Sequence, residues 1–395
     1  MLIQFSRLAV SLVVARWVGP DSFGVWNALN LILLYGPLVT LGVANGMNRD
    51  VPVYRGRRDY ETADKIIEVS YGFVLASTAI AGLGISAIAM TDLVDATYHS
   101  SLLVMGFLFF SWGMYQFFQL LLKSSISFRL MSVQQIIFAV LLPAVSLPLA
   151  YFLDVPGFIL GQAIVALIMV IVIARLATYK IPISWDRDLF ISLVKVGFPI
   201  MAAGLLYRLL TSVDRWVILT FLSVEELGQY TLAILAVSVL GLLPSVIGQQ
   251  IYPRMAYRYG ETHDKKALKP LIVRQSAMAM IVTLPILAIV FITLPYIVDI
   301  FLPQYALGVP PARILLLGLA FIPLAGGFAN FLNTVNKQVY YLAVQAAALI
   351  VNLALNMVFI RLGYGLNGVA LAAATTYFLY TCALVITAYF VYKFE

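Results

Sequence analysis

Long uninterrupted apolar stretches dominate the pattern along this 395-residue chain. Ten of them run for at least twenty residues without Asp, Glu, Lys or Arg: 22–48, 69–91, 96–122, 130–153, 155–174, 227–253, 275–298, 314–336, 338–360 and 362–392. A hydrocarbon core of about 30 Å takes roughly twenty apolar residues to cross as a helix, and no soluble fold needs ten such runs in series. The pattern predicts a protein that crosses a membrane many times.

Two further apolar segments, residues 1–19 and about 193–222, contain charges and bring the predicted spans to twelve. Backbone polar groups in lipid must be satisfied within one segment, and these runs lack the alternation of barrel strands. We therefore predict an all-α membrane protein with about twelve transmembrane helices.

Composition excludes a separate aqueous domain. Hydrophobic residues make up 62% of the chain and charged residues 11%, and the longest polar stretches, about 48–65 and 253–270, are far shorter than the roughly 50 residues of an independent domain. One cysteine and two distant histidines offer no metal cluster, so we expect neither a metal nor a cofactor. The D-x-D sequence at 186–188 lies in a short linker and is explained by solvated charges.

Lysine and arginine are distributed unevenly between alternate loops. One set of loops and ends holds 19 of the 25, and the other set holds only Arg16, Arg215, Arg313 and Arg361. Because cytoplasmic loops retain these residues, we expect both termini on the cytoplasmic side of the plasma or inner membrane. The net charge of +7 is mostly a topology signal, so no nucleic-acid partner is expected.

The two halves of the chain resemble each other at an offset of 204 residues. Phe23–Trp26 then aligns with Leu227–Tyr230, each a turn that opens the next helix. We expect a six-helix bundle over 1–180, a cytoplasmic linker over 181–192 and a second six-helix bundle over 193–395. Six helices is an even number, so the repeat is parallel, as in transporters with a central cleft. The first predicted helix is shortened relative to its counterpart.

Charges inside the predicted spans are the main candidates for chemistry. Arg208 lies near mid-membrane, and the offset places Arg7 at a similar depth. Since an arginine there costs several kcal/mol, these residues should face a polar cavity or a partner, and together with Arg215 they would form a diphosphate site. The alternative is structural pairing of Arg208 and snorkelling of Arg7. Asp214 would accept a coupling proton or cation, or form an ion pair with Arg215.

Amide side chains interrupt several spans. Asn330, Asn333 and Asn336 recur at every third position and predict one polar stripe along a helix, and Gln249 interrupts an earlier span. Amides bind sugar hydroxyls, but they also form hydrogen bonds between membrane helices. Both a glycan-binding and a structural role remain open for these residues.

Several short sequences resemble a known family. The similarity is to short motifs of polysaccharide exporters of the O-antigen flippase (Wzx) type. It is carried by Ser6-Arg7, by the run Ala15–Trp26 with its A-R-W-V-G-P-D-S-F-G core, by Thr40–Gly46 and by Val213–Trp216. Exporters of this type belong to the multidrug/oligosaccharidyl-lipid/polysaccharide exporter superfamily. Ser6-Arg7 resembles the position of a cavity arginine in the lipid II branch of that superfamily.

The resemblance implies a flippase rather than an enzyme. Its substrate would be a polyprenyl-diphosphate-linked oligosaccharide, moved from the cytoplasmic to the outer face by alternating access for cell-surface polysaccharide biosynthesis. The implied partners are this lipid-linked oligosaccharide, membrane lipids and the polysaccharide polymerase machinery.

Three other classes of protein remain as alternatives. A cation-coupled multidrug exporter would favour an acidic cavity, whereas the charges inside the spans are mostly arginine. A carrier of the major facilitator type would have a differently spaced loop motif. A membrane glycosyltransferase or ligase would need a large outer loop, and the outer loops here hold at most about a dozen residues.

Overall fold

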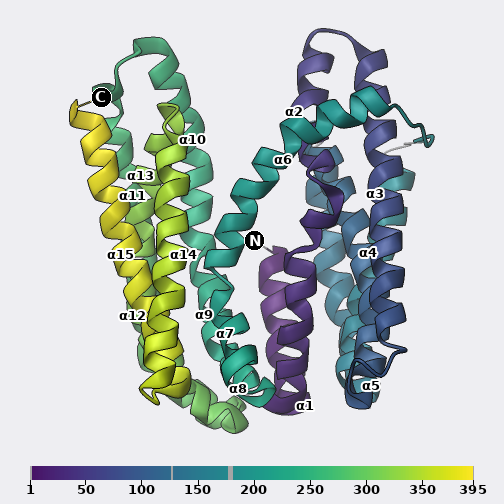
Figure 1. The fold of residues 1–395 in the computed structure, drawn as a ribbon, viewed down its shortest axis with the longest axis vertical. Helices are drawn as coiled ribbons and strands as arrows, with labels where there is room; N and C mark the ends of the chain where they lie inside the picture. Colours follow the sequence, from purple (N-terminus) through teal and green to yellow (C-terminus); the bar gives the residue numbers. More distant parts are fainter. Residues whose placement is uncertain (1, 126–127, 177–180, 395) are drawn as a thin grey trace. The chain divides into compact units, whose positions relative to one another are not determined.

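The computed structural model describes residues 2–125, 128–176 and 181–394 (Figure 1). Every regular element within these ranges is an α-helix or a 3₁₀ helix, and none is a strand. The prediction of an all-α fold is confirmed. The last residues of the predicted first bundle, 177–180, lie outside the described ranges.

The helices follow one another closely along the chain. Up to the linker the order is α1 (Leu2–Leu34), η1 (Gly36–Thr40), α2 (Val43–Gly56), α3 (Tyr60–Ile88), α4 (Ala96–Ser124) and α5 (Phe128–Leu176). After it come α6 (Arg187–Leu210), α7 (Val213–Phe221), α8 (Val224–Gln229), α9 (Thr231–Leu240), α10 (Leu242–Thr262), η2 (Lys265–Leu268), α11 (Lys269–Phe301), η3 (Pro303–Gly308), α12 (Val309–Leu319), α13 (Ile322–Thr334), α14 (Gln338–Arg361) and α15 (Gly365–Phe394).

Nine helical stretches of the described chain are long and apolar enough to cross a membrane, or ten if the bent pair Pro303–Leu319 and Ile322–Thr334 is one span. Two of the nine each contain two helical arms, joined at Gly19 in α1 and at Asp154 in α5. Gly19 has a φ of 77°, which a glycine adopts without steric cost. When the arms are counted separately and the bent pair is counted as one span, the number equals the twelve spans that the sequence predicts.

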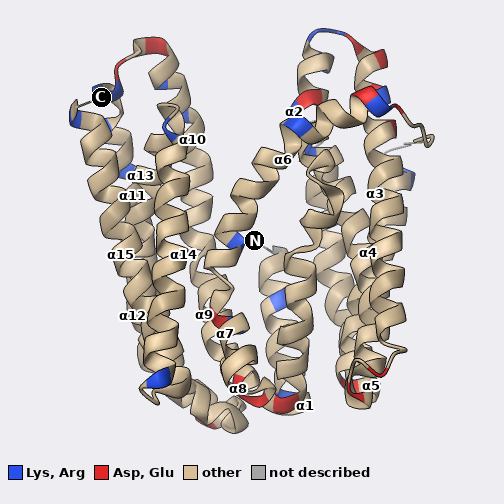
Figure 2. Ribbon diagram, viewed as in Figure 1, with Lys and Arg blue, Asp and Glu red and all other residues tan. Residues whose placement is uncertain are grey.

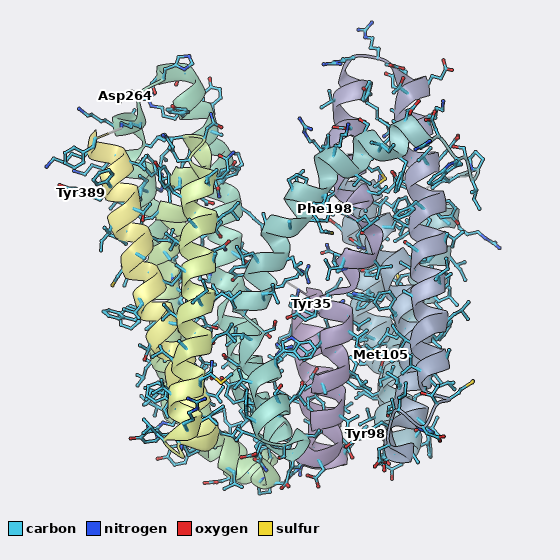
Figure 3. The ribbon with its side chains drawn as sticks, in the orientation of Figure 1. Tyr35, Tyr98, Met105, Phe198, Asp264 and Tyr389 are labelled. Atoms are coloured by element: carbon cyan, nitrogen blue, oxygen red, sulfur yellow. The ribbon has the colours of Figure 1, made fainter. Side chains whose placement is uncertain are left out.

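The surface of these helices is apolar, as a lipid environment requires. Leu83, Ile80 and Ile281 are each more than two-thirds exposed, and Tyr389 projects outward from α15, whereas Met105 is buried among the helices of its unit (Figure 3). Lysine, arginine, aspartate and glutamate gather mainly at the helix ends (Figure 2). The protein is therefore a multi-pass membrane protein.

The chain forms two compact units. Unit 1 comprises the residues up to Val18 together with Val25–Arg208, and unit 2 comprises Gly19–Gly24 together with Leu209–Glu395. In unit 1, α4 packs against α3 and α5; in unit 2, α15 packs against α12, α13 and α14. The division cuts α1 at its turn and α6 near its end.

Close contacts at glycines explain why residues 19–24 belong to unit 2 and why most of α6 belongs to unit 1. In unit 2, a Cβ on Gly228 of α8 would overlap the carbonyl of Pro20, so only a glycine lets the turn at 19–24 approach this closely. In unit 1, a Cβ on Gly197 of α6 would overlap the carbonyl of Gly42, which precedes α2. Small residues of this kind allow membrane helices to pack backbone against backbone.

Candidate functional site

Arg7 lies in unit 1, on the first arm of α1, against two aromatic rings. Its guanidinium carbon is 4.6 Å from the ring centroid of Trp112 on α4 and 5.1 Å from that of Phe138 on α5. Among the described residues, no carboxylate lies within ion-pair distance of it and none accepts a hydrogen bond from it. Aromatic faces attract a cation by their quadrupole and do not occupy its N–H donors.

The rings are held in place by buried contacts. Phe138 stacks on Tyr115, with ring centroids 5.3 Å apart and planes inclined by 22°, and the Tyr115 hydroxyl donates to Gln134 Oε1 at 3.1 Å. All three side chains are buried. The Nε2 atom of Gln134 is also buried and has no hydrogen-bond partner within the described chain. We call Arg7, Trp112, Tyr115, Gln134 and Phe138 the Arg7 cradle.

Ser6 fixes the same helix to α5. Its hydroxyl donates to the carbonyl of Ala139 at 2.7 Å. That carbonyl would normally accept from the N–H four residues later, but the residue there is Pro143, which has no N–H. In a lipid environment an unpaired carbonyl is costly, so Ser6 supplies the missing donor and sets the position of Arg7 beside the rings.

Arg208 lies in the last turn of α6 and contacts a different element of unit 1. Its Nη1 donates to the carbonyl of Leu34, the last residue of α1, at 3.4 Å. The next helical donor is diverted, because the N–H of Leu38 bonds to Tyr35 instead. A cation at the C-terminal end of a helix satisfies an orphan carbonyl and complements the helix dipole.

Asp214 and Arg215 lie in unit 2, on α7. Asp214 is 6% exposed, and its Oδ2 accepts a hydrogen bond of 3.1 Å from the hydroxyl of Tyr230, which is fully buried. Its Oδ1 is buried without a hydrogen-bond partner among the described residues. Tyr230 thus donates a hydrogen bond to Asp214, and an ion pair of Asp214 with its neighbour Arg215 stays a prediction.

The predicted asparagine stripe is interrupted. Asn330 on α13 donates to Gln275 Oε1 at 3.0 Å and to the Gly248 carbonyl at 3.4 Å, so it joins α13 to α11 and α10. Asn333 is half-buried on the same helix, but Asn336 lies beyond the end of α13 with a φ of 59°, the left-handed conformation that ends many helices. Gln249 is exposed on α10.

Sequence reasoning treated Arg313 only as part of the topology signal. The structure places this residue on α12 with its guanidinium carbon 4.1 Å from the ring centroid of Phe291 on α11. Asn352 and Asn356 of α14 are two further amides within the apolar spans, and the sequence pattern assigned them no specific role. In the structure they are buried and bond to each other, and Asn352 donates to Thr376 of α15 at 3.2 Å. The four-residue spacing of these asparagines was the available signal. No group of three or more His, Cys, Asp or Glu side chains comes together within the described ranges.

The fold is similar to that of solved transporters. A multidrug resistance MATE family transporter of the MOP superfamily, in an inward-facing conformation, superposes with a TM-score of 0.78 at 14% identity, covering 99% of this chain and 94% of that one. The lipid II flippase MurJ, in an inward closed conformation, gives 0.74 at 14% identity, covering 97% and 85%. At these identities the likeness establishes the fold.

Two sequence matches carry the comparison further. A curated relative, "Putative O-antigen transporter" of Shigella flexneri, is 20% identical over 378 residues, which cover 91% of this chain and 88% of the relative. The sequence model of a family described as "Polysaccharide biosynthesis protein" matches residues 13–305. Because that match spans well over half of the chain, this multi-pass helical membrane protein belongs to the polysaccharide biosynthesis protein family.

Proposed function

We propose that the protein moves a polyprenyl-diphosphate-linked oligosaccharide from the cytoplasmic to the outer face of the cell membrane. The family and the similarity to an O-antigen transporter and to the fold of a lipid II flippase support this proposal. The observation that carries it is the Arg7 cradle. It keeps a guanidinium inside an apolar span, against two aromatic rings and with no carboxylate of the described residues in contact.

Such an arginine suits a diphosphate for a physical reason. A carboxylate partner would neutralise the charge and use its donors, whereas two ring faces stabilise the cation and leave its edge free. The N–H groups on that edge match phosphate oxygens in a fork. A diphosphate that carries about two negative charges would compensate the cation inside the membrane, while the prenyl chain stays in lipid.

The remaining predicted residues have supporting roles in this proposal. Arg208 and Arg215 would add positive charge along the path of the diphosphate. Asp214, with one oxygen open, would take up a coupling proton or cation. Gln249 is exposed on α10 and would meet the saccharide, as would Asn333, whereas Asn330 is bonded to Gln275 and Asn336 ends a helix.

Flipping can be tested in proteoliposomes with a fluorescent polyprenyl-diphosphate oligosaccharide whose exposed fraction is quenched from outside. Arg7→Gln should slow flipping by about tenfold or more, because a charge-assisted contact of roughly 1.5–3 kcal/mol is lost. Arg7→Lys should keep part of the rate as a point charge. Arg258→Gln is the matched control, since it removes an arginine that already donates to Glu261 at 3.2 Å. Unchanged flipping by monodisperse Arg7→Gln and Arg208→Gln would refute the proposal.

A second candidate is a cation-coupled exporter of small molecules. The observation that favours it is the buried Asp214, whose Oδ1 accepts no hydrogen bond from the part of the chain that the structure describes. The same proteoliposomes distinguish the two functions. Export of a cationic dye that depends on Asp214, without movement of the lipid-linked oligosaccharide, would favour the exporter.

The proposal also fixes an orientation, with both termini in the cytoplasm. Single cysteines at Arg57, Lys266 and Tyr98 can be tested with a thiol reagent that does not cross the membrane. Only the cysteine at Tyr98 should react from outside. Reaction at 57 or 266 but not at 98 would reverse the orientation.

A further inference from the structure

Arg313 is a second cation that rests on an aromatic ring inside an apolar helix. It lies on α12, and its guanidinium carbon is 4.1 Å from the ring centroid of Phe291 on α11. Both helices belong to unit 2. Among the described residues it contacts one ring, whereas Arg7 contacts two.

Nothing in the described part of the chain neutralises this arginine. No carboxylate lies within ion-pair distance of it, and no side chain or carbonyl accepts its hydrogen bonds. Its Nε is buried without an acceptor. A buried N–H without an acceptor is costly in a low-dielectric environment, so an acceptor from outside the chain would stabilise this guanidinium.

The position on α12 shows from which direction that acceptor comes. Ala312 and Leu316 are fully buried and belong to the face that packs inside unit 2. Pro310 and Leu317, three residues before and four after Arg313, are exposed, and Leu317 has 57% of its surface accessible. Residues at these spacings share one face of a helix, so Arg313 lies at the border between the packed face and the lipid-facing surface.

The neighbouring helix has the same character. Ile292, next to Phe291, is 63% exposed, and Tyr296 one turn further is 67% exposed. The exposed neighbours on α11 are therefore an aliphatic and an aromatic side chain, and tyrosine is a residue that is enriched where lipid headgroups begin. An apolar surface does not favour binding of a soluble anion. It does favour an anion attached to an acyl or prenyl chain, because the hydrocarbon chain packs against the exposed apolar side chains.

We propose that Arg313 binds the phosphate group of a membrane lipid on the exposed side of α11 and α12 in unit 2. The guanidinium matches phosphate oxygens in shape and charge, and the exposed residues beside it accommodate the hydrocarbon chain. The phosphate comes either from a resident phospholipid or from a polyprenyl diphosphate, and the second source alone rests on the proposed function.

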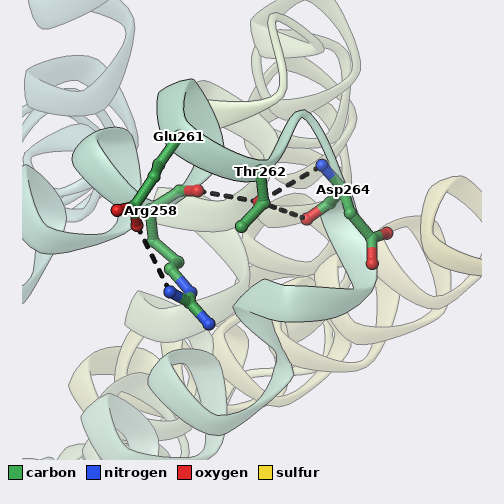
Figure 4. A network of polar contacts seen from close by, with 4 residues as sticks. All are labelled: Arg258, Glu261, Thr262 and Asp264. Atoms are coloured by element: carbon green, nitrogen blue, oxygen red, sulfur yellow. Dashed lines mark hydrogen bonds and ion pairs between the residues drawn. The ribbon is translucent and has the colours of Figure 1, made fainter.

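Native mass spectrometry of the full-length protein tests the inference by counting bound lipids. Two probes are used, phosphatidylglycerol and farnesyl diphosphate, each titrated against wild type and Arg313→Gln. The variant should bind at least one of them about tenfold more weakly, and Arg313→Lys should lie between. Arg258→Gln should match wild type, because Arg258 is already paired with Glu261 (Figure 4).

The pattern of loss identifies the lipid. Loss of phosphatidylglycerol indicates a resident phospholipid, and loss confined to farnesyl diphosphate indicates a site for the transported class of lipid. The first outcome stands even if flipping of oligosaccharides is disproved. Wild-type binding of both probes by a monodisperse Arg313→Gln protein would overturn the inference and leave water as the acceptor.

A footprint on the unaltered protein removes the dependence on folding of the variant. Phenylglyoxal modifies accessible arginine side chains, and the modified residues are identified by peptide mapping. Phosphatidylglycerol in bicelles should slow modification of Arg313 relative to bicelles of uncharged, phosphate-free lipid. Equal rates in the two bicelles would contradict the proposal.

Discussion

Arg7 in unit 1 and Arg313 in unit 2 are both stabilised by aromatic rings, but the number of rings and their surroundings differ. Each is an arginine in an apolar helix without a carboxylate in contact among the described residues. Arg7 meets two rings, at 4.6 Å and 5.1 Å, and one of them belongs to a buried stack with Tyr115. Arg313 meets one ring at 4.1 Å, on a helix that exposes the apolar side chain of Leu317.

The difference shows what aromatic rings do for a membrane cation. They stabilise the charge without consuming its donors, and a rigid pair of rings also fixes its direction. Arg7 is therefore preorganised for a transient ligand, whereas Arg313 has one ring and a buried Nε that lacks an acceptor. We expect Arg7 to matter mainly for transport and Arg313 mainly for lipid attachment.

Transport rates give the largest contrast between the two residues. Arg7→Gln should reduce flipping by about tenfold or more, and Arg313→Gln by no more than about threefold, because a lipid on the outer surface of one unit affects the moving substrate indirectly. Both rates are measured in the same proteoliposomes. Equal reductions of the flipping rate in the two variants would contradict the separate roles of Arg7 in transport and of Arg313 in lipid binding.

Removing the nearer ring of the Arg7 cradle should have the next largest effect. In a double-mutant cycle, Trp112→Leu and Arg7→Gln should show a coupling of about 1–2 kcal/mol in thermal unfolding, since a desolvated cation–π contact has about this strength. Tyr71→Leu removes a ring of α3 that contacts Phe117 in a tilted geometry; it is the control and should couple to Arg7 negligibly. Additive effects of Trp112→Leu and Arg7→Gln would show that the rings do not stabilise the charge.

The same cycle on Phe291→Leu and Arg313→Gln should give a smaller coupling, about 0.5–1 kcal/mol, because only one ring is present and the site is more exposed. The measurement is again thermal unfolding in detergent. Addition of phosphatidylglycerol should stabilise wild type more than Arg313→Gln. A coupling larger than that of Trp112 with Arg7 would reverse the comparison.

Asp186 is a charged residue that has an ion-pair partner, and we expect its effect on stability to be smaller than the effects of Arg7 and Arg313. Asp186, just before α6, accepts from Lys65 at 2.8 Å. The backbone N–H of Leu189, and then Lys65, hold the pKa of the Asp186 carboxyl below its ordinary value. The stabilisation is therefore present at neutral pH and is lost as pH falls from about 4 through the lowered folded-state pKa.

This acid sensitivity should be the smallest of the four effects, because exposed ion pairs contribute little. It is measured as the difference in unfolding temperature between wild type and Asp186→Asn from pH 7 to pH 3, which should shrink on acidification. A difference that grows on acidification would contradict the assignment.

For some tertiary contacts the sequence indicates one of the two partners but not the other. Pro143 implies that the carbonyl of Ala139 lacks its helical donor, but only the fold shows that Ser6, 133 residues earlier, supplies one. The polar spacing of Asn330, Asn333 and Asn336 predicts a single stripe. The stripe fails at Asn336 because α13 ends at Thr334 and the chain turns there.

The sequence by itself determined the environment of the chain: the all-α fold, the apolar spans and the concentration of charges at helix ends. A bilayer acts on each segment separately, since every span must satisfy its own backbone and cover its own 30 Å or so of hydrocarbon. Only the tertiary structure decided which partner each internal charge receives. Arg7 meets rings more than a hundred residues away, Arg208 meets the end of α1, and Asp214 meets Tyr230. Those choices depend on how helices distant in sequence pack, which no local pattern specifies.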